Sequence, residues 1–221
     1  FIKLIRNPEL ACEVTMQPLR RFDLDASILF SDILIISDLL RMELKFIEKK
    51  GPVFDSPLST QKDLDRIGKP DGVEKLEYVF ETIDLIKKQL NGKIPLIGFI
   101  GSPWTVATYL IEGNSTKTFK KVLRILKEDE LFLERLLEQI TTLSIDYLQK
   151  QVAHGVDITM IFDTWGSLLN ENEYERFSLK YIRKIKEALI LNDVPLIYYS
   201  RGLGDKLNYV ENLNVDVLGI D

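Results

Sequence analysis

The chain has 221 residues, of which 45% are hydrophobic and 29% charged, and its formal net charge is −5. This composition suffices for a sizeable core and excludes a disordered chain, and no apolar run is long enough to span a bilayer. The acidic balance argues against a nucleic-acid binder and favours small-molecule partners. The single cysteine, Cys12, cannot form an internal disulfide, which fits a reducing cytoplasm.

The N-terminal segment predicts a short helix followed by a buried strand. Asn7 and Pro8 begin a helix that Pro18 should bend or end. Residues 26–32, ASILFSD, form an apolar run of strand length. The run finishes in Asp32, so an acidic group is expected at the carboxyl end of this strand.

The longest excursion lies between the first two strands. Residues 45–54 predict a short ribbon around the Gly-Pro pair at 51–52, and residues 58–68 predict a small helix with Ser or Thr at its start. Residues 71–92 then supply a crossover helix. Such an insertion is expected over the mouth of a barrel.

The segment 95–113, PLIGFIGSPWTVATYLIEG, joins a buried strand directly to a helix. Ser102 is an N-cap residue and Pro103 suits the first helical position. Thr105 and Tyr109 are four apart, so they share one face of that helix. Junctions of this kind present side chains to ligands in α/β proteins.

Three further apolar runs end in polar or acidic groups, at residues 158–166, 194–202 and 215–221, and a long helix over 128–152 precedes them. Five strands separated by helices predict a parallel sheet with right-handed crossovers. Neither GxGxxG nor a Walker-type motif follows any strand, so a (β/α)8 TIM barrel is favoured over a doubly wound nucleotide-binding sheet.

Both ends suggest an incomplete barrel. The chain opens at Phe1 rather than Met and stops at Asp221, directly after a strand. A closed barrel of this type has eight strands, and about five are visible. We therefore expect residues 1–221 to be a single TIM-barrel domain that is truncated at both ends.

Five segments in order resemble the uroporphyrinogen decarboxylase family of haem biosynthesis: ELACEVTMQPLRR (9–21), ILFSDIL (28–34), GPVFDSP (51–57), residues 95–113 and MIFDTWGSLL (160–169). The resemblance implies a (β/α)8 barrel, a cytoplasmic homodimer and no metal or organic cofactor. It also implies a tetrapyrrole substrate: the four acetate side chains of uroporphyrinogen III are decarboxylated to give coproporphyrinogen III.

Asp32 is the residue that the resemblance places at the centre of the catalytic cleft. Loss of CO2 from a pyrrole acetate needs an electron sink, which protonation of the pyrrole carbon supplies by making the ring cationic. One carboxylate can accept the pyrrole N–H bonds and balance that charge. The residue type alone favours an N-cap after the strand over catalysis, and the resemblance reverses that order.

The resemblance also assigns substrate binding to Tyr109 and Thr164, whose hydroxyls can donate hydrogen bonds to carboxylates. Alternatively, Tyr109 packs its ring on the sheet and Thr164 caps the next helix. Three apolar side chains are either pocket walls or barrel core, because strand parity does not separate these roles when both faces are buried: Ile28, Phe30 and Phe99.

Other conspicuous residues fit structural roles. His154 ends the long helix and is expected to contact terminal carbonyls. One His and one Cys make a zinc site improbable. Trp104 and Trp165 suit the barrel rim more than a ligand contact. Asp163 and Asp221 end buried strands, but the resemblance gives no reason to choose either.

Two departures from the family affect the expected site. The family's arginine-rich RQAGR-type segment and its C-terminal histidine have no counterpart here, so the chain alone is expected to be inactive while its full-length parent is active. Arg41 and Lys45 stand where relatives have small residues and glycine, so the rim near Asp32 is expected to differ.

Two alternatives remain open. Corrinoid or thiol methyltransferases share this barrel and use a His-x-Cys pair with a distant Cys to hold zinc. These 221 residues lack the pair, but the C-terminal part expected beyond Asp221 has room for it. A non-catalytic porphyrin-binding relative is the other alternative, and joint retention of Asp32, Tyr109 and Thr164 argues against it.

Overall fold

The computed structural model describes residues 1–190 and 193–221, without the side chains of residues 205 and 206. A five-stranded parallel sheet forms its centre, with the strand order β1-β4-β5-β6-β7. The strands are β1 (Ser27–Ile28), β4 (Leu96–Gly101), β5 (Ile158–Asp163), β6 (Leu196–Ser200) and β7 (Val217–Gly219). Each falls within one of the five predicted strands, so the α/β prediction is confirmed, and the chain forms a partial barrel.

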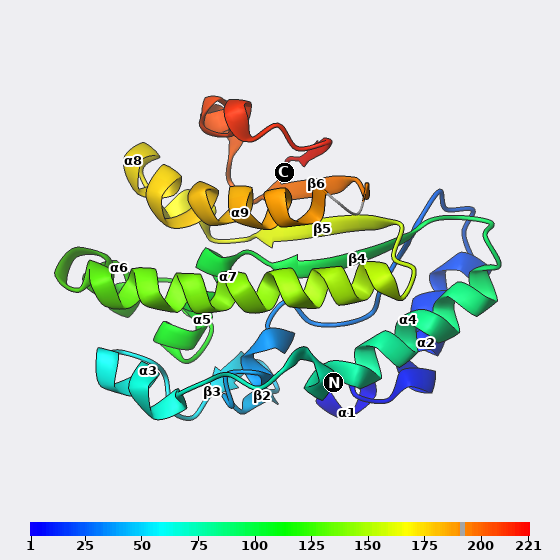
Figure 1. The fold of residues 1–221 in the computed structure, drawn as a ribbon, viewed down its shortest axis with the longest axis horizontal. Helices are drawn as coiled ribbons and strands as arrows, with labels where there is room; N and C mark the ends of the chain where they lie inside the picture. Colours follow the sequence, from blue (N-terminus) through cyan, green and yellow to red (C-terminus); the bar gives the residue numbers. More distant parts are fainter. Residues whose placement is uncertain (191–192) are drawn as a thin grey trace.

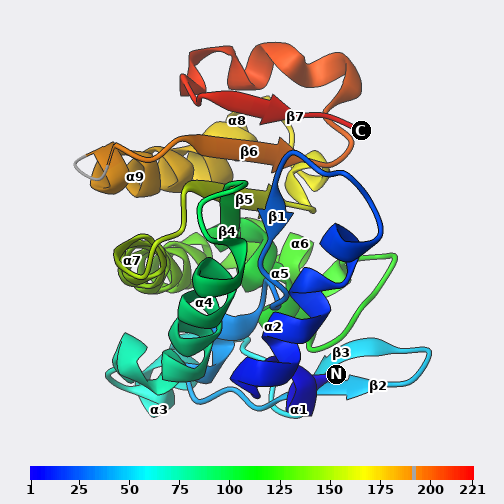
Figure 2. The same ribbon diagram turned by 90° about the vertical axis from the view of Figure 1, so that its right-hand side faces the viewer.

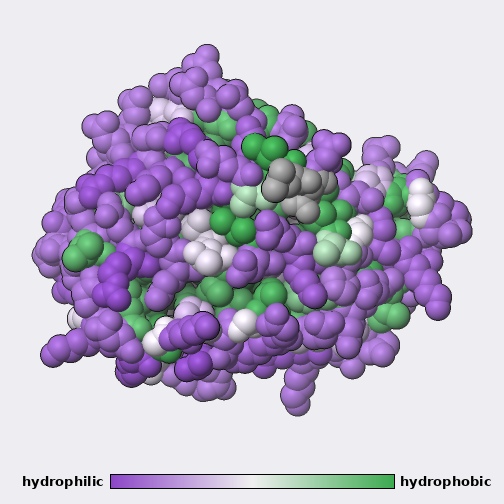
Figure 3. Space-filling model, in the orientation of Figure 1, coloured by the Kyte–Doolittle hydropathy of each residue, from purple (hydrophilic) through white to green (hydrophobic). Residues whose placement is uncertain are grey.

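Helices cover one side of the curved sheet. The α-helices are α1 (Ile2–Ile5), α2 (Pro8–Met16), α3 (Gln61–Ile67), α4 (Glu77–Leu90), α5 (Pro103–Glu112), α6 (Lys120–Glu128), α7 (Glu130–Ala153), α8 (Glu171–Tyr174) and α9 (Lys180–Leu189). In Figure 1, α7 and α9 run alongside the central strands, and Figure 2 shows α4, α7 and α9 next to one another on the same side of the sheet. The surface seen in Figure 3 is mainly hydrophilic, as expected for the outer face of such a layer.

Short helical turns join these elements. They are η1 (Pro18–Arg20), η2 (Ile35–Asp38), η3 (Val73–Leu76), η4 (Gly166–Leu168) and η7 (Gly204–Leu213), together with η5 (Glu175–Leu179), a single π-helical turn. The predicted crossover helix over 71–92 is therefore η3 followed by α4. None of the helices described is long and apolar enough to cross a membrane.

The expected helix ends are confirmed by their capping geometry. The side chain of Asn7 accepts from the backbone N–H of Leu10, and α2 ends before Pro18, which begins η1. Thr60 caps α3 in a reciprocal capping box with Asp63. These local hydrogen bonds depend only on nearby residues, which is why the sequence predicts them well.

The ribbon is present, but its predicted turn is wrong. Strand β2 (Leu44–Ile47) pairs antiparallel with β3 (Gly51–Phe54), and Gly51 lies opposite Ile47. The turn occupies residues 48–50, with Lys49 at φ 65°. The Gly-Pro pair therefore begins β3, a position where proline costs no sheet hydrogen bond. The backbone N–H of Phe54 donates to Gly113 O, so the ribbon is tied to the end of α5.

Both outer strands of the sheet leave apolar side chains in contact with solvent. Ile28 of β1 is 45% exposed and Val217 of β7 is 49% exposed. Within the described residues, neither strand has a neighbour on its outer side. The ring is therefore open between β1 and β7, where further strands would close a barrel.

Candidate functional site

The carboxyl ends of the strands gather the three residues singled out by the resemblance. Asp32 follows β1, Tyr109 lies on α5 beyond β4, and Thr164 directly follows β5. The ring centroid of Tyr109 is 6.1 Å from that of Trp165, the neighbour of Thr164. The negative charge of Asp32 contributes to raising the pKa of Tyr109, so these two groups also interact.

Asp32 is half-buried and uses one carboxylate oxygen in a local turn. Its Oδ1 accepts a 2.7 Å hydrogen bond from the backbone N–H of Leu34. Burial raises the pKa of Asp32 although this N–H opposes the shift, and the nearby charge of Asp38 raises it further. The turn precedes η2, whose N-cap is Leu34. The expected helix N-cap is therefore wrong in detail, since Asp32 caps a turn instead.

The second oxygen of Asp32, Oδ2, accepts no hydrogen bond from the described residues. A partly desolvated carboxylate with one free oxygen is a strong acceptor for an N–H donor. This is the feature that a pyrrole ligand requires.

Tyr109 belongs to an aromatic cluster and also packs against the hydrophobic core. Its ring packs against Trp165, and the centroid of the Phe119 ring lies 4.6 Å from that of Trp165. Burial raises the pKa of the Tyr109 phenol, while Trp165 and the positive charge of Arg201 oppose the shift. The phenol therefore remains protonated at neutral pH and serves as a hydrogen-bond donor.

Thr164 is half-buried and its hydroxyl has no hydrogen-bond partner among the described groups. The helix cap considered for it is wrong, because Trp165 is the N-cap of η4 and Asn170 caps α8. Burial alternates along β5, so Asp163 shares the helix-covered face with Ile161, whereas Phe162 lies on the less buried face.

Apolar side chains line that less buried face across three strands. Phe99 of β4 packs edge-on against Phe162 of β5, with centroids 5.5 Å apart, and Phe162 lies 5.9 Å from Tyr199 of β6. The two faces of the sheet are therefore unequal in burial. Phe99 is buried as part of the core, with Phe162 and Tyr199 beside it, and its role as a pocket wall stays a prediction.

Asp163, which the sequence left unassigned, is the most buried carboxylate near the site. Its side chain is fully buried and accepts hydrogen bonds from the hydroxyls of Ser102, Thr105, Ser178 and Tyr198. The one feature of the sequence that pointed to Asp163 is its position at the end of a predicted strand, β5. The four partners are 15 to 61 residues away along the chain, so no local pattern predicts them.

Arg201 is a second residue that the sequence analysis missed. It follows β6, and its guanidinium carbon lies 5.9 Å from the centroid of the Trp165 ring. It forms no ion pair with any side chain described. An exposed guanidinium beside the Tyr109 cluster is suited to an anionic group of a ligand.

The remaining aromatic and basic candidates have structural contacts. Trp104 is fully buried and its indole N–H donates to Trp165 O at 2.9 Å. The ring of His154 stacks on Phe80 and its Nδ1 lies 3.0 Å from a carboxylate oxygen of Asp84. Only the backbone N–H of His154 reaches the helix-terminal carbonyls, so the expected side-chain contact is wrong.

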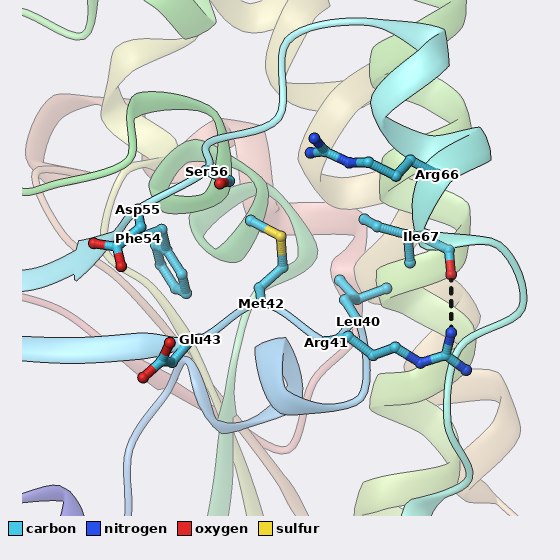
Figure 4. A pocket seen from close by; sticks show the side chains of 9 residues that line it. All are labelled: Leu40, Arg41, Met42, Glu43, Phe54, Asp55, Ser56, Arg66 and Ile67. Atoms are coloured by element: carbon cyan, nitrogen blue, oxygen red, sulfur yellow. Dashed lines mark hydrogen bonds between the residues drawn. The ribbon is translucent and has the colours of Figure 1, made fainter.

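Arg41 lines a hollow of about 400 Å3 (Figure 4). Its backbone is left-handed, with φ 55°, a conformation that glycine adopts more readily than other residues. Its side chain bonds Asp71 at 2.8 Å and reaches Ile67 O at 3.5 Å. These contacts hold Arg41 against the segment of Ile67 and Asp71, and its effect on the rim near Asp32 stays a prediction.

The fold and the site place this protein in the class of (β/α)-barrel proteins: the barrel is partial, and a carboxylate and hydroxyls lie at the carboxyl ends of its strands. The chain belongs to the uroporphyrinogen decarboxylase (URO-D) family, whose model matches residues 1–221. It is 46% identical over 225 residues to uroporphyrinogen decarboxylase from Ruthia magnifica and 45% identical to that from Vibrio campbellii.

These comparisons cover all of this chain but 65% and 63% of the two relatives, so the chain spans just under two thirds of their length. A methyltransferase from Methanosarcina mazei has the same fold, with a TM-score of 0.76 and 18% identity over 96% of this chain and 62% of that chain. At this identity, the likeness concerns the fold alone.

Proposed function

We propose that this chain carries the central part of an enzyme that decarboxylates the four acetate side chains of uroporphyrinogen III to give coproporphyrinogen III. The observation that carries the proposal is Asp32, a half-buried carboxylate at the end of β1 with one oxygen free to accept a pyrrole N–H. Family membership favours this reaction over methyl transfer.

Each turnover exchanges one CO2 for one proton. A proton adds to a pyrrole carbon, the bond between the acetate methylene and its carboxylate breaks, and its electron pair enters the cationic ring as CO2 leaves. A second proton then adds to the methylene and the first is released, so the acetate becomes a methyl group. Asp32 stabilises the cation; at about 4 Å and an effective dielectric of about 20, such a pair contributes about 4 kcal/mol.

The other residues of the site bind the substrate. Tyr109 and Thr164 donate hydrogen bonds to its carboxylates, and Arg201 pairs with a carboxylate at the rim. The row that includes Phe99 supplies an apolar wall for the macrocycle. The family resemblance also supports a homodimer that needs no cofactor. We place the enzyme in the cytoplasm, which the single cysteine, Cys12, supports because it is buried and forms no disulfide.

Turnover with uroporphyrinogen III tests the proposal. The longer polypeptide of these experiments is one in which this chain is extended to the length of the curated relatives. We expect it to form coproporphyrinogen under anaerobic conditions. We expect the 221-residue chain alone to form none, because the arginine-rich segment and the histidine of the family lie outside it. Oxidation and chromatography of the products give the readout. A folded longer polypeptide without this activity would overturn the proposed function.

A further inference from the structure

The carboxylate of Asp163 has a complete set of hydrogen-bond donors on the covered side of the sheet. Oδ1 accepts from Ser102 Oγ at 2.6 Å and Thr105 Oγ1 at 3.0 Å, and Oδ2 accepts from Ser178 Oγ at 2.6 Å and Tyr198 OH at 2.8 Å. Four bonds match the acceptor capacity of a carboxylate. A buried charge without a paired cation is tolerated only when it is hydrogen-bonded in this way.

One of the bonds to Oδ1 continues to the peptide group after Thr164, and a separate backbone bond holds the peptide group before it. Thr105 Oγ1, which donates to Asp163, also accepts from the backbone N–H of Trp165 at 3.3 Å. On the other side of Thr164, the carbonyl of Asp163 accepts from the backbone N–H of Arg201 at 3.3 Å. The backbone of Thr164 is therefore fixed on each side, although its own hydroxyl has no partner among the described groups.

The same oxygen fixes the start of α5. Ser102 Oγ donates to Asp163 and accepts from the backbone N–H of Thr105 at 3.0 Å, so the cap of the helix is tied to β5. Tyr109 follows Thr105 by one helical turn on the same face. One helical turn thus leads from Tyr109 to Thr105, whose hydroxyl donates to Asp163 in a buried hydrogen bond and accepts from Trp165 N–H, and these two residues are the chain neighbours of Thr164.

We propose that Asp163 and Thr105 are positioning residues that set the distance between the hydroxyls of Tyr109 and Thr164. This inference rests on the proposed function, in which those hydroxyls bind the tetrapyrrole. The two oxygens of Asp163 have different partners: Oδ1 binds Thr105, which also bonds Trp165, whereas Oδ2 binds Ser178 and Tyr198. Tyr198 reaches the Asp163 carbonyl only through the hydroxyls of Tyr174 and Ser200, and Ser178 has no further bond toward Thr164 among the described residues.

A matched pair of variants separates positioning from a purely structural role. Thr105→Val and Ser178→Ala each remove one buried hydroxyl that donates to Asp163. In the longer polypeptide, at a temperature where both variants are folded, we expect Thr105→Val to lower kcat for uroporphyrinogen III about tenfold or more, because misplacement by about 1 Å is costly. Ser178→Ala should stay within about twofold of the unmodified enzyme.

Thr105→Ser restores the hydroxyl, so it should recover kcat to within about threefold. The affinity of the 221-residue chain for uroporphyrin, measured by tryptophan quenching, gives a readout that needs no turnover, and Thr105→Val should weaken it about fivefold or more. Unchanged kcat and affinity in folded Thr105→Val, or equal losses in Ser178→Ala, would overturn the inference. An inactive unmodified enzyme would instead overturn the proposed function.

Discussion

Asp32 combines a functional demand with a cost in stability. It must be ionised to accept an N–H and balance a cation, yet burial raises its pKa above the ordinary value of 3.8. The folded state therefore binds this proton more tightly than the unfolded state. The resulting stabilisation is complete below pH 3.8 and is lost as the pH rises through the folded-state pKa.

Asp32→Asn should accordingly raise the melting temperature at pH 7, because the amide keeps the bond from Leu34 and removes the buried charge. The advantage over the unmodified chain should shrink as the pH falls from 7 toward 4.5, since the carboxyl then becomes protonated. Thermal unfolding across this range gives the measurement, with the exposed Asp23→Asn as control. A destabilised Asn variant at pH 7 would contradict the assigned burial of the charge.

The proposed role of Arg201 depends on a single charge that forms no ion pair with the described side chains. Arg201→Gln should weaken uroporphyrin binding by the 221-residue chain about fivefold to tenfold at low salt, the loss of one charge-assisted hydrogen bond. Its effect should diminish at high salt. Arg124→Gln removes another exposed guanidinium, on α6, and should leave binding unchanged. Equal affinities for the Arg201 variant and the unmodified chain would remove Arg201 from the site.

Individual residues differ in how well the sequence predicts them. Asp32, Tyr109 and Thr164 were available from the family resemblance, and the structure places them at the carboxyl ends of neighbouring strands. The hydrogen-bond partners of Asp163 were not available, because residues from α5, η5 and β6 meet it only after folding. Arg201 had the signal of a strand end but no local motif.

At the scale of elements, the sequence predicts features whose causes are local. Apolar runs, the Asn7 and Thr60 caps and the Ser102-Pro103 helix start all depend on neighbours within a few residues. The predicted turn of the ribbon was wrong because it was placed at the Gly-Pro pair, whereas Lys49 adopts a left-handed conformation in the observed turn. The pairing register of β2 with β3 sets the position of the turn, and this register depends on residues farther apart than those that cap a helix.

The junction of β5 with η4 shows how tightly elements must meet around the site. A side-chain carbon at Gly166 would lie 2.7 Å from the ring of Tyr174 and 2.8 Å from both Asp163 Oδ2 and Ser200 Oγ. Only glycine therefore allows η4 to turn directly over the hydroxyl shell of Asp163. The same close approach brings the start of η4 next to Ser200 of β6.

At the scale of the whole molecule, five parallel strands form an open part of a barrel ring. The exposed apolar side chains of β1 and β7 mark the two edges where additional strands would pair. The candidate residues occupy one arc of the ring, from Asp32 after β1 to Arg201 after β6. We infer that groups from the other arc complete the substrate site, which explains why the chain alone is expected to bind porphyrin without turning it over.

Turnover by the Asp32→Asn variant of the longer polypeptide tests the central role of this carboxylate most directly. We predict that decarboxylation of uroporphyrinogen III falls at least about a thousandfold, because the amide no longer balances the cationic ring. The variant should remain folded and still bind uroporphyrin. Formation of coproporphyrinogen at a rate within tenfold of the unmodified enzyme would contradict the account.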